Sequence, residues 1–242
     1  MKLELNNVTL LGIDCVNPSR LSIIMDLCQE EIKFADVKLL SSIKINDKRW
    51  VKINNIACLE DYSIFCLRNL INYVMTDYVL LIQWDGFILN PKSWSNLFTK
   101  YDYLGSPWVV KDWAINDFGF PESLRGQRIV GNGGFCLRSH NFLKISSSLY
   151  NAGKIIRTHP EDIAISVWYR NLFISEGINF APVELARLFA FEGADDKYST
   201  QFGFHGFYSN LNDWFEENKN RKEIYNMFLE YKRLEKSSWK PI

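Results

Sequence analysis

The stretch YVLLIQW at residues 78–84 is the strongest strand signal in the chain. A continuous apolar run of this length is typical of a strand that is buried on both faces in a parallel sheet. Shorter β-branched and apolar runs at residues 8–13 and 37–40 predict two more strands before it.

Two segments with helical spacing separate these strands. In the first, Asn17 and Pro18 predict a helix start, and one apolar face follows at Leu21, Ile24, Met25, Cys28 and Ile32. In the second, Asp61 is expected to cap a helix whose inner face is formed by Ile64, Leu67, Leu70, Ile71 and Val74. The order strand, helix, strand, helix, strand predicts a Rossmann-like α/β unit over the first 85 residues.

The second half of the sequence is less regular. Short strands are expected at residues 103–106 and 135–138, and helices at 161–173 and 222–235. Residues 111–132 are rich in Asn, Gly, Pro and Arg, and we expect a loop that closes over a site. The last helix carries an apolar stripe, for which docking on the protein's own core is favoured over a membrane or a partner: Ile224, Met227, Phe228, Tyr231 and Leu234.

Composition excludes several classes of protein. The chain has 242 residues, 47% of them hydrophobic, and its 28 basic residues balance 28 acidic ones, so nothing points to nucleic acid. The five cysteines form no CxxC pair and lie in apolar runs, which favours buried, reduced thiols. We find neither a signal-peptide pattern nor an apolar run of about 20 residues. A cytoplasmic protein is therefore expected, with peripheral contact at the inner face of the membrane as an open alternative.

The motif Gln83-Trp84-Asp85-Gly86 directly follows the strongest strand. In doubly wound sheets, ligands bind at the carboxyl ends of the strands, where an acidic residue can reach a metal-bound phosphate. Asp-Gly is also a common dipeptide of plain turns, so this motif alone leaves both interpretations open.

Three later clusters carry candidate chemistry. The run VGNGGF at residues 130–135 lets the backbone pass close to a ligand, although it is neither a P-loop nor a GxGxxG motif. Glu161 and Asp162 stand at a helix start, where they either stabilise the helix dipole or supply a base. His205, in FGFHG at residues 202–206, is a candidate metal ligand, whereas a lone histidine is more often structural.

The order of these motifs resembles that of GT-A glycosyltransferases. More closely, six segments resemble a family of bacterial glycosyltransferase-like proteins found with surface-polysaccharide genes, and distantly the β-1,4- and β-1,3-galactosyltransferases. The segments are DYVLLIQWDGFILN (77–90), YDYLGSPW (101–108), VGNGGFCLRS (130–139), PEDIAISVWYR (160–170), FAPVELARLFAFE (180–192) and FGFHGF (202–207). The resemblance spans about residues 8–210.

This resemblance implies one GT-A domain over residues 1–242, with a mixed, mostly parallel sheet. About 1–105 would bind a nucleotide-sugar, with a UDP-sugar favoured, and about 106–242 would bind a glycan or lipid-linked glycan acceptor of lipopolysaccharide, capsule or another surface polysaccharide. Asp85 matches the last acid of a DxD motif, with Gln83 in place of the first. With His205, Asp85 would hold Mn²⁺ or Mg²⁺. The implied donor-binding residues are Asp14, Asn17, Arg20, Gln83, Trp84, Asp85, Gly133 and Gly134, and the acceptor-binding residues are Asn132, Glu161 and Trp108.

An inverting hexosyl transfer is the mechanism that the resemblance favours. Asp162 would accept the proton of the acceptor hydroxyl, Glu161 would hydrogen-bond the acceptor, and Trp84, Trp108 and Trp113 could stack on a sugar or base. Three alternatives stay open: a retaining transferase, a catalytically silent sugar- or nucleotide-binding module, and a metal-dependent phosphohydrolase using Asp85, Asp162 and His205.

Overall fold

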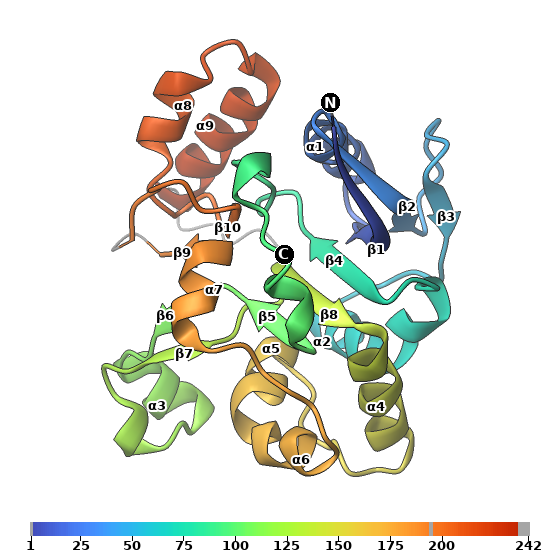
Figure 1. Ribbon diagram of the computed structural model, residues 1–242, viewed down its shortest axis with the longest axis vertical. Helices are drawn as coiled ribbons and strands as arrows, with labels where there is room; N and C mark the ends of the chain where they lie inside the picture. Colours follow the sequence, from blue (N-terminus) through green and yellow to red (C-terminus); the bar gives the residue numbers. More distant parts are fainter. Residues whose placement is uncertain (1, 194–195, 237–242) are drawn as a thin grey trace.

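The computed structural model describes residues 2–193 and 196–236 (Figure 1). Its centre is a six-stranded sheet with the order β3-β2-β1-β4-β8-β5. The strands of this sheet are β1 (Leu3–Ile13), β2 (Ile32–Ser41), β3 (Trp50–Lys52), β4 (Tyr78–Ile82), β5 (Tyr103–Gly105) and β8 (Phe135–Ser139). Two short pairs complete the described strands: β6 (Pro107–Val109) with β7 (Arg128–Val130), and β9 (Ala190–Glu192) with β10 (Gly203–His205).

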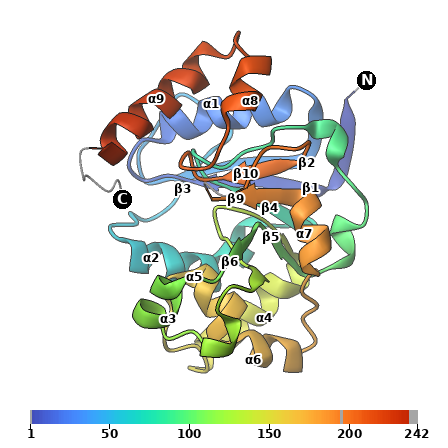
Figure 2. The same cartoon turned by 90° about the vertical axis from the view of Figure 1, so that its left-hand side faces the viewer.

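The helices cover both faces of this sheet. Figure 2 shows α1, α8 and α9 on one side and α2, α4, α5 and α6 on the other. The helices are α1 (Pro18–Gln29), α2 (Leu59–Ile64), α3 (Asp112–Phe118), α4 (His140–Asn151), α5 (Glu161–Ile163), α6 (Arg170–Ser175), α7 (Val183–Phe189), α8 (Asn212–Glu217) and α9 (Lys222–Lys236). Within the described ranges, no helix is both long and apolar enough to cross a membrane.

The predicted central strand is confirmed as β4. Its residues Val79, Leu80, Leu81 and Ile82 are completely buried, because β4 lies between β1 and β8 and is covered on both faces. The strand ends at Ile82 rather than Trp84, since Gln83 already pairs with Gly86 in an isolated bridge that closes a tight turn.

The sheet is mixed and mostly parallel, as predicted. β1 runs parallel to both β2 and β4, and β2 runs parallel to β3, which is the Rossmann-like half. β8 runs antiparallel to β4 and to β5.

Two details of the predicted helices are wrong. α1 ends at Gln29, and Ile32 opens β2 instead of extending the helix. α2 has Cys58 rather than Asp61 at its N-cap, and Asp61 lies in its first turn. The helical path continues beyond α2 as a π-helical turn over Phe65–Asn69 and a 3-10 turn over Leu70–Tyr73.

The expected loop at residues 111–132 also needs correction, because it contains α3, a 3-10 turn over Glu122–Leu124 and β7. This segment has a small core of its own, formed by Val110, Ala114, Phe120 and Ile163. Ile163 belongs to α5, so the segment packs against the short helix that starts with Glu161. Closure of the segment over a site stays a prediction.

The helix expected at residues 161–173 is interrupted. α5 covers only Glu161–Ile163, a π-helical turn follows over Ala164–Trp168, and α6 begins at Arg170.

The C-terminal helix docks on the protein's own core, as predicted. Ile224 and Phe228 of α9 are buried, and the Phe228 ring lies 4.8 Å from that of Phe215 and 5.8 Å from that of Phe207. Leu234, the fifth member of the expected stripe, lies outside the residues whose side chains are described.

Candidate functional site

Strand register brings three sequence motifs to one edge of the sheet. Gly12 of β1 pairs with Ile82 of β4, so the parallel strands end side by side, and Asp14 and Gln83 follow them. β8 runs the other way and its first residue, Phe135, pairs with the same Ile82. The glycine turn that enters β8 therefore meets the carboxyl ends of β1 and β4, which is the edge where such sheets bind ligands.

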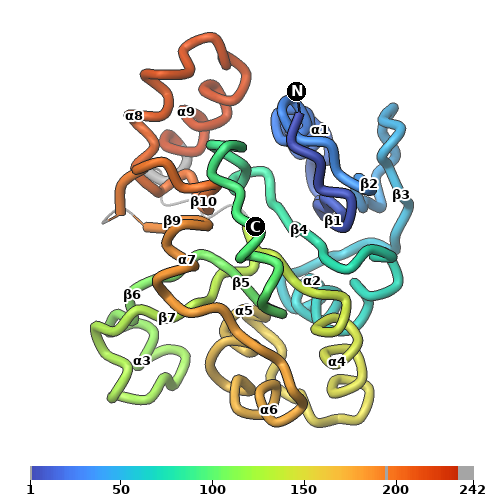
Figure 3. Tube along the Cα trace, in the orientation of Figure 1, coloured from blue at the N-terminus to red at the C-terminus, as the bar shows by residue number. Residues whose placement is uncertain are grey.

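A late segment of the chain completes this edge. Ile88, just after the Gln83–Gly86 turn, bridges to Gly203 of β10, and the Gly206 amide donates to the Asp85 carbonyl over 2.8 Å. Figure 3 shows the orange segment that carries β9 and β10 beside the green segment that follows β4. Within the parallel β9–β10 pair, His205 stands opposite Glu192.

His205 stands between acidic and amide groups. Its Nε2 lies 3.1 Å from Gln83 Oε1 and 3.8 Å from Asp85 Oδ1, while its Nδ1 lies 3.1 Å from Glu192 Oε1. Burial alone would lower the pKa of His205, but the carboxylates of Asp85 and Glu192 raise it to about 9. Burial raises the pKa of Asp85, against the opposing effect of His205. The predicted pair Asp85 and His205 is thus brought together.

Gly134 lies directly against these groups. A Cβ at this position would stand 2.0 Å from His205 Nε2 and 2.8 Å from Gln83 Oε1. Glycine is therefore required here, because the backbone passes directly against both polar atoms.

Glu192 connects the parts of the site, and the sequence did not single it out. Its carboxylate accepts from Asn132 Nδ2 over 2.6 Å and from the Tyr208 hydroxyl, besides contacting His205. The signal that could have identified it is an acid ending the quoted segment FAPVELARLFAFE, at the end of a short apolar run.

The Asn132 side chain stabilises the glycine turn through hydrogen bonds to its backbone. Its backbone has a positive φ of 60°, and its Oδ1 accepts from the amides of Gly134 and Phe135, each over 2.9 Å. With Nδ2 bound to Glu192, the side chain ties this turn to β9. A contact between Asn132 and an acceptor stays a prediction.

Glu161 lies beneath the same turn in a buried ion pair. Its Oε1 is 3.3 Å from Nη2 of Arg138, which is completely buried. A Cβ on Gly133 would stand 2.0 Å from the same Oε1. Gly133 and Glu161, both predicted site residues, are thus in direct contact, and Arg138 is a further residue that the sequence did not indicate.

Asp162 differs from its neighbour. It is half-buried, and its Oδ1 accepts from the Ile163 amide over 2.8 Å. Burial, followed by the negative charges of Glu161 and Glu192, raises the pKa of Asp162 to about 7. A carboxylic acid that titrates near neutrality is suited to accept a proton from a substrate hydroxyl.

Asp14, Arg20 and Trp84 form a connected group where β1 and β4 end. Asp14 Oδ2 accepts from Arg20 Nε over 2.8 Å, and the Arg20 guanidinium lies 4.2 Å from the centroid of the Trp84 ring. Asn17 is the N-cap of α1, but its side chain makes no capping bond. The backbone N–H of Asn17 donates to Asp14 Oδ1 over 2.8 Å. The Trp84 ring also packs on Phe207 and Tyr231. Stacking of this ring on a sugar or base stays a prediction.

Trp108 and Trp113 lie on the other side of the glycine turn. Trp108 Nε1 would be 2.4 Å from a Cβ on Gly131, and the Trp108 and Trp113 rings stack at 5.8 Å with 23° between their planes. Trp113 is 45% exposed. An exposed indole backed by a second indole is a surface on which the apolar face of a sugar can stack.

Asp85, His205 and Gln83 also suit a divalent cation. A carboxylate, an imidazole nitrogen and an amide oxygen are all ligands of Mn²⁺ or Mg²⁺. Over the residues that are described, no three His, Cys, Asp or Glu side chains gather into a complete cation site.

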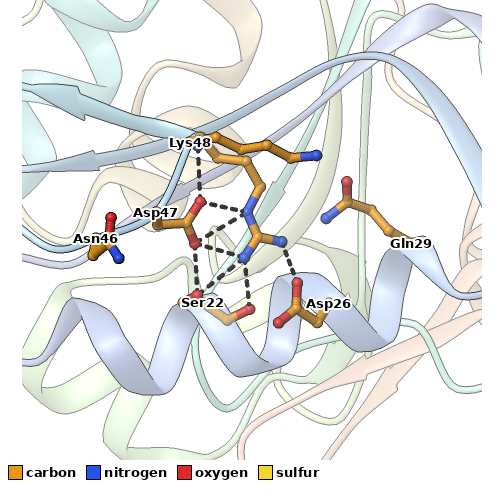
Figure 4. Close-up of a pocket in the computed structure, with 7 residues that line it drawn as sticks. Ser22, Asp26, Gln29, Asn46, Asp47 and Lys48 are labelled. Atoms are coloured by element: carbon orange, nitrogen blue, oxygen red, sulfur yellow. Dashed lines mark hydrogen bonds and ion pairs between the residues drawn. The ribbon is translucent and has the colours of Figure 1, made fainter.

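The hollow drawn in Figure 4 shares no residue with this edge. It has a volume of about 390 Å³ and lies between α1 and the segment that precedes β3. The Arg49 guanidinium within it is bound by Asp47 over 2.6 Å, by Asp26 over 2.7 Å and by the Ser22 hydroxyl over 3.0 Å. These charged groups satisfy one another. The residues that line the hollow therefore form a structural ion-pair cluster, and this cluster links α1 to the segment that precedes β3.

The chain belongs to a known family. The family model described as "Protein of unknown function (DUF5672)" matches residues 48–205, which include every motif from the central strand to His205. No match exists among the curated proteins.

Solved structures with a similar backbone fold include three glycosyltransferases. The galactosyltransferase LgtC, in complex with donor and acceptor sugar analogues, is 12% identical, with 82% of this chain and 86% of that chain covered and a TM-score of 0.48. The apo-form glycosyltransferase GlyE of Streptococcus pneumoniae is 13% identical, with 88% and 55% covered and a TM-score of 0.45. A glycosyltransferase involved in glycosylation of the major capsid of PBCV-1 is 11% identical, with 87% and 97% covered and a TM-score of 0.46. At these values the likenesses transfer no activity to this chain.

Proposed function

We propose that this protein is a GT-A glycosyltransferase that moves a sugar, a hexose in our expectation, from a nucleotide-sugar to a glycan acceptor with inversion. The observation that carries the proposal is the edge of the sheet where Asp85 Oδ1 and His205 Nε2 lie 3.8 Å apart, as residues that would hold a cation. Asp162, whose pKa is raised by burial, would act as the base. A base beside a site for a diphosphate leaving group is what a direct displacement at an anomeric carbon requires.

On the donor side, Arg20 and Asp85 are the groups that would face the diphosphate. Asp14 holds Arg20 through Nε, which leaves the two terminal nitrogens of the guanidinium to contact phosphate oxygens. Asp85 and His205 would hold the divalent cation. When bound, the cation neutralises the negative charge that develops on the leaving diphosphate.

In the reaction, the acceptor hydroxyl oxygen bonds to the anomeric carbon on the face opposite the leaving group. The bond between that carbon and the diphosphate oxygen breaks, and its electron pair leaves with the nucleoside diphosphate. Asp162 takes the hydroxyl proton. Trp113, with Trp108 behind it, would stack on the acceptor sugar and so hold its hydroxyl in position.

The test has two stages. Thermal shift with a panel of nucleotide-sugars, with and without Mn²⁺, should show one donor that raises the melting temperature, because a ligand that binds only the folded state stabilises it. That donor is then incubated with candidate glycans, and the product linkage is read by NMR. A product that retains the anomeric configuration overturns the role of Asp162. Donor binding without turnover favours a binding module, and donor cleavage that needs no acceptor favours a hydrolase.

A further inference from the structure

The side chain of Gln83 is held at both ends. Its Nε2 donates to the Tyr62 hydroxyl oxygen over 3.0 Å, and its Oε1 lies 3.1 Å from His205 Nε2. Tyr62 comes from α2 and His205 from β10, so the amide bridges two elements that are far apart in the sequence. Gln83 stands where a DxD motif would have its first carboxylate.

The Tyr62 hydroxyl sets which end of the amide faces the site. Burial raises the pKa of the Cys66 thiol, and a hydrogen bond from this hydroxyl opposes part of that rise, as a proton donor does. With its proton directed to Cys66, the hydroxyl oxygen accepts from the amide nitrogen of Gln83. The Gln83 carbonyl oxygen is consequently turned toward His205.

The spacing of the polar atoms fits a shared ion. Two neighbouring ligands bound at about 2.1 Å in an octahedral shell lie roughly 3 Å apart. Gln83 Oε1 and His205 Nε2 are 3.1 Å apart.

We propose that Gln83 is a neutral oxygen ligand of the cation, and that Tyr62 is the positioning residue that aims it. This inference rests on the proposed function. The protein then contributes a single negative charge, that of Asp85, together with two neutral atoms. Because one carboxylate attracts a divalent cation weakly, the cation should bind well only together with the diphosphate of the nucleotide.

The experiment measures Mn²⁺ binding rather than activity. Free Mn²⁺ is titrated by electron paramagnetic resonance against the full chain, alone and with UDP, GDP or dTDP, and binding of each nucleotide is also measured without metal. The variants are Tyr62→Phe, which frees the Gln83 amide, and Gln83→Asp, which adds a carboxylate. Tyr78→Phe is the matched control. Tyr78 is the first residue of β4, at the opposite end of the strand from Gln83, and its hydroxyl donates to the Thr99 carbonyl.

The wild-type chain should bind Mn²⁺ at least about tenfold more tightly with one of the nucleotides than alone. Tyr62→Phe should weaken this Mn²⁺ binding by about tenfold, a usual loss when the group that orients a ligand is removed, and leave metal-free nucleotide binding unchanged. Gln83→Asp should tighten Mn²⁺ binding without nucleotide, and Tyr78→Phe should behave as wild type.

Two failures are distinguishable. If the wild-type chain shows no nucleotide-dependent Mn²⁺ binding, the cation site of the proposed function and this inference fall together. If the wild-type chain shows it and Tyr62→Phe binds Mn²⁺ equally well, only the inference is overturned. A Tyr62→Phe variant that merely melts at a lower temperature, with unchanged Mn²⁺ affinity, counts against it in the same way.

Discussion

Arg138 Nη2 and Glu161 Oε1 face each other over 3.3 Å in the core, directly below Gly133. Because of this ion pair, the adjacent acids Glu161 and Asp162 have different environments and different expected roles. Glu161 neutralises a completely buried guanidinium, whereas Asp162, one residue later, is half-buried and keeps a proton up to about pH 7.

Removal of the Glu161 charge should destabilise the fold. Glu161→Gln leaves the buried Arg138 guanidinium without its counter-charge, which typically costs about 3–5 kcal/mol of unfolding free energy. The double variant Arg138→Met with Glu161→Gln should recover much of that loss, because no buried charge remains. Urea unfolding of both variants checks this. An unchanged unfolding midpoint with a raised acceptor KM would instead support the sequence-based role of Glu161 as an acceptor ligand.

Loss of the base should affect turnover and not donor binding. Asp162→Asn keeps the shape of the side chain but cannot accept a proton, so kcat should fall by roughly 10²–10⁴-fold. Steady-state kinetics, with donor dissociation measured separately by calorimetry, separates the two quantities. Asp117→Asn, an exposed acid on α3, is the control and should retain full kcat. A kcat for Asp162→Asn above about a tenth of the wild-type value excludes Asp162 as the base.

The titration of Asp162 should appear in both rate and stability. As the base must be ionised, wild-type kcat should rise with pH and level off above about pH 7. The folded-state pKa is raised above the unfolded value of about 3.9, so the folded state binds the proton more tightly and stability declines as pH rises between these values. Asp162→Asn lacks this decline. Its melting temperature relative to wild type should therefore increase between about pH 4 and pH 7, and a constant difference across that window contradicts the raised pKa.

Trp113 should contribute to acceptor binding alone. Stacking on an aromatic ring is worth about 0.5–1.5 kcal/mol, so Trp113→Ala should raise the acceptor KM by about 2- to 12-fold. Trp113→Phe, which keeps an aromatic face, should lie between the alanine variant and wild type. The donor KM should be equal in all three proteins. A change in the donor KM would contradict a role of Trp113 in acceptor binding alone.

The Asp47–Arg49 cluster should stabilise the fold at neutral pH and contribute much less in acid. Hydrogen bonds from Arg49 hold the pKa of Asp47 well below its usual range. A depressed folded-state pKa stabilises the protein above the unfolded pKa, and this contribution is lost as pH falls through the folded value. Asp47→Asn should therefore lower the melting temperature at pH 7 and much less near pH 2. Asp26→Asn, whose side chain is 70% exposed in its contact with Arg49, should have a smaller effect at pH 7.

Local patterns predicted the frame of the fold because each strand and helix of the first half is encoded by neighbouring residues. The apolar run of β4 is the clearest case, and the motif order indicated that Asp85, Gly134 and His205 would meet. Glu192, Tyr62 and Arg138 were missed because their importance depends on contacts across the chain. The interrupted helices near residues 65–69 and 164–168 were missed for a different reason, since π-helical turns are rare and occur as single turns within segments that otherwise have a helical pattern.

The contact between Gln83 and His205 joins residues that are 122 positions apart. Contacts of such long range pay their loop-closure entropy before they bring any stabilisation, so they tend to form late in folding. During synthesis the Rossmann-like half leaves the ribosome first, while the proposed cation ligands stay incomplete until β10 has emerged. Any nascent or truncated chain that stops before residue 205 should therefore fold in part and yet be unable to bind Mn²⁺ with a nucleotide.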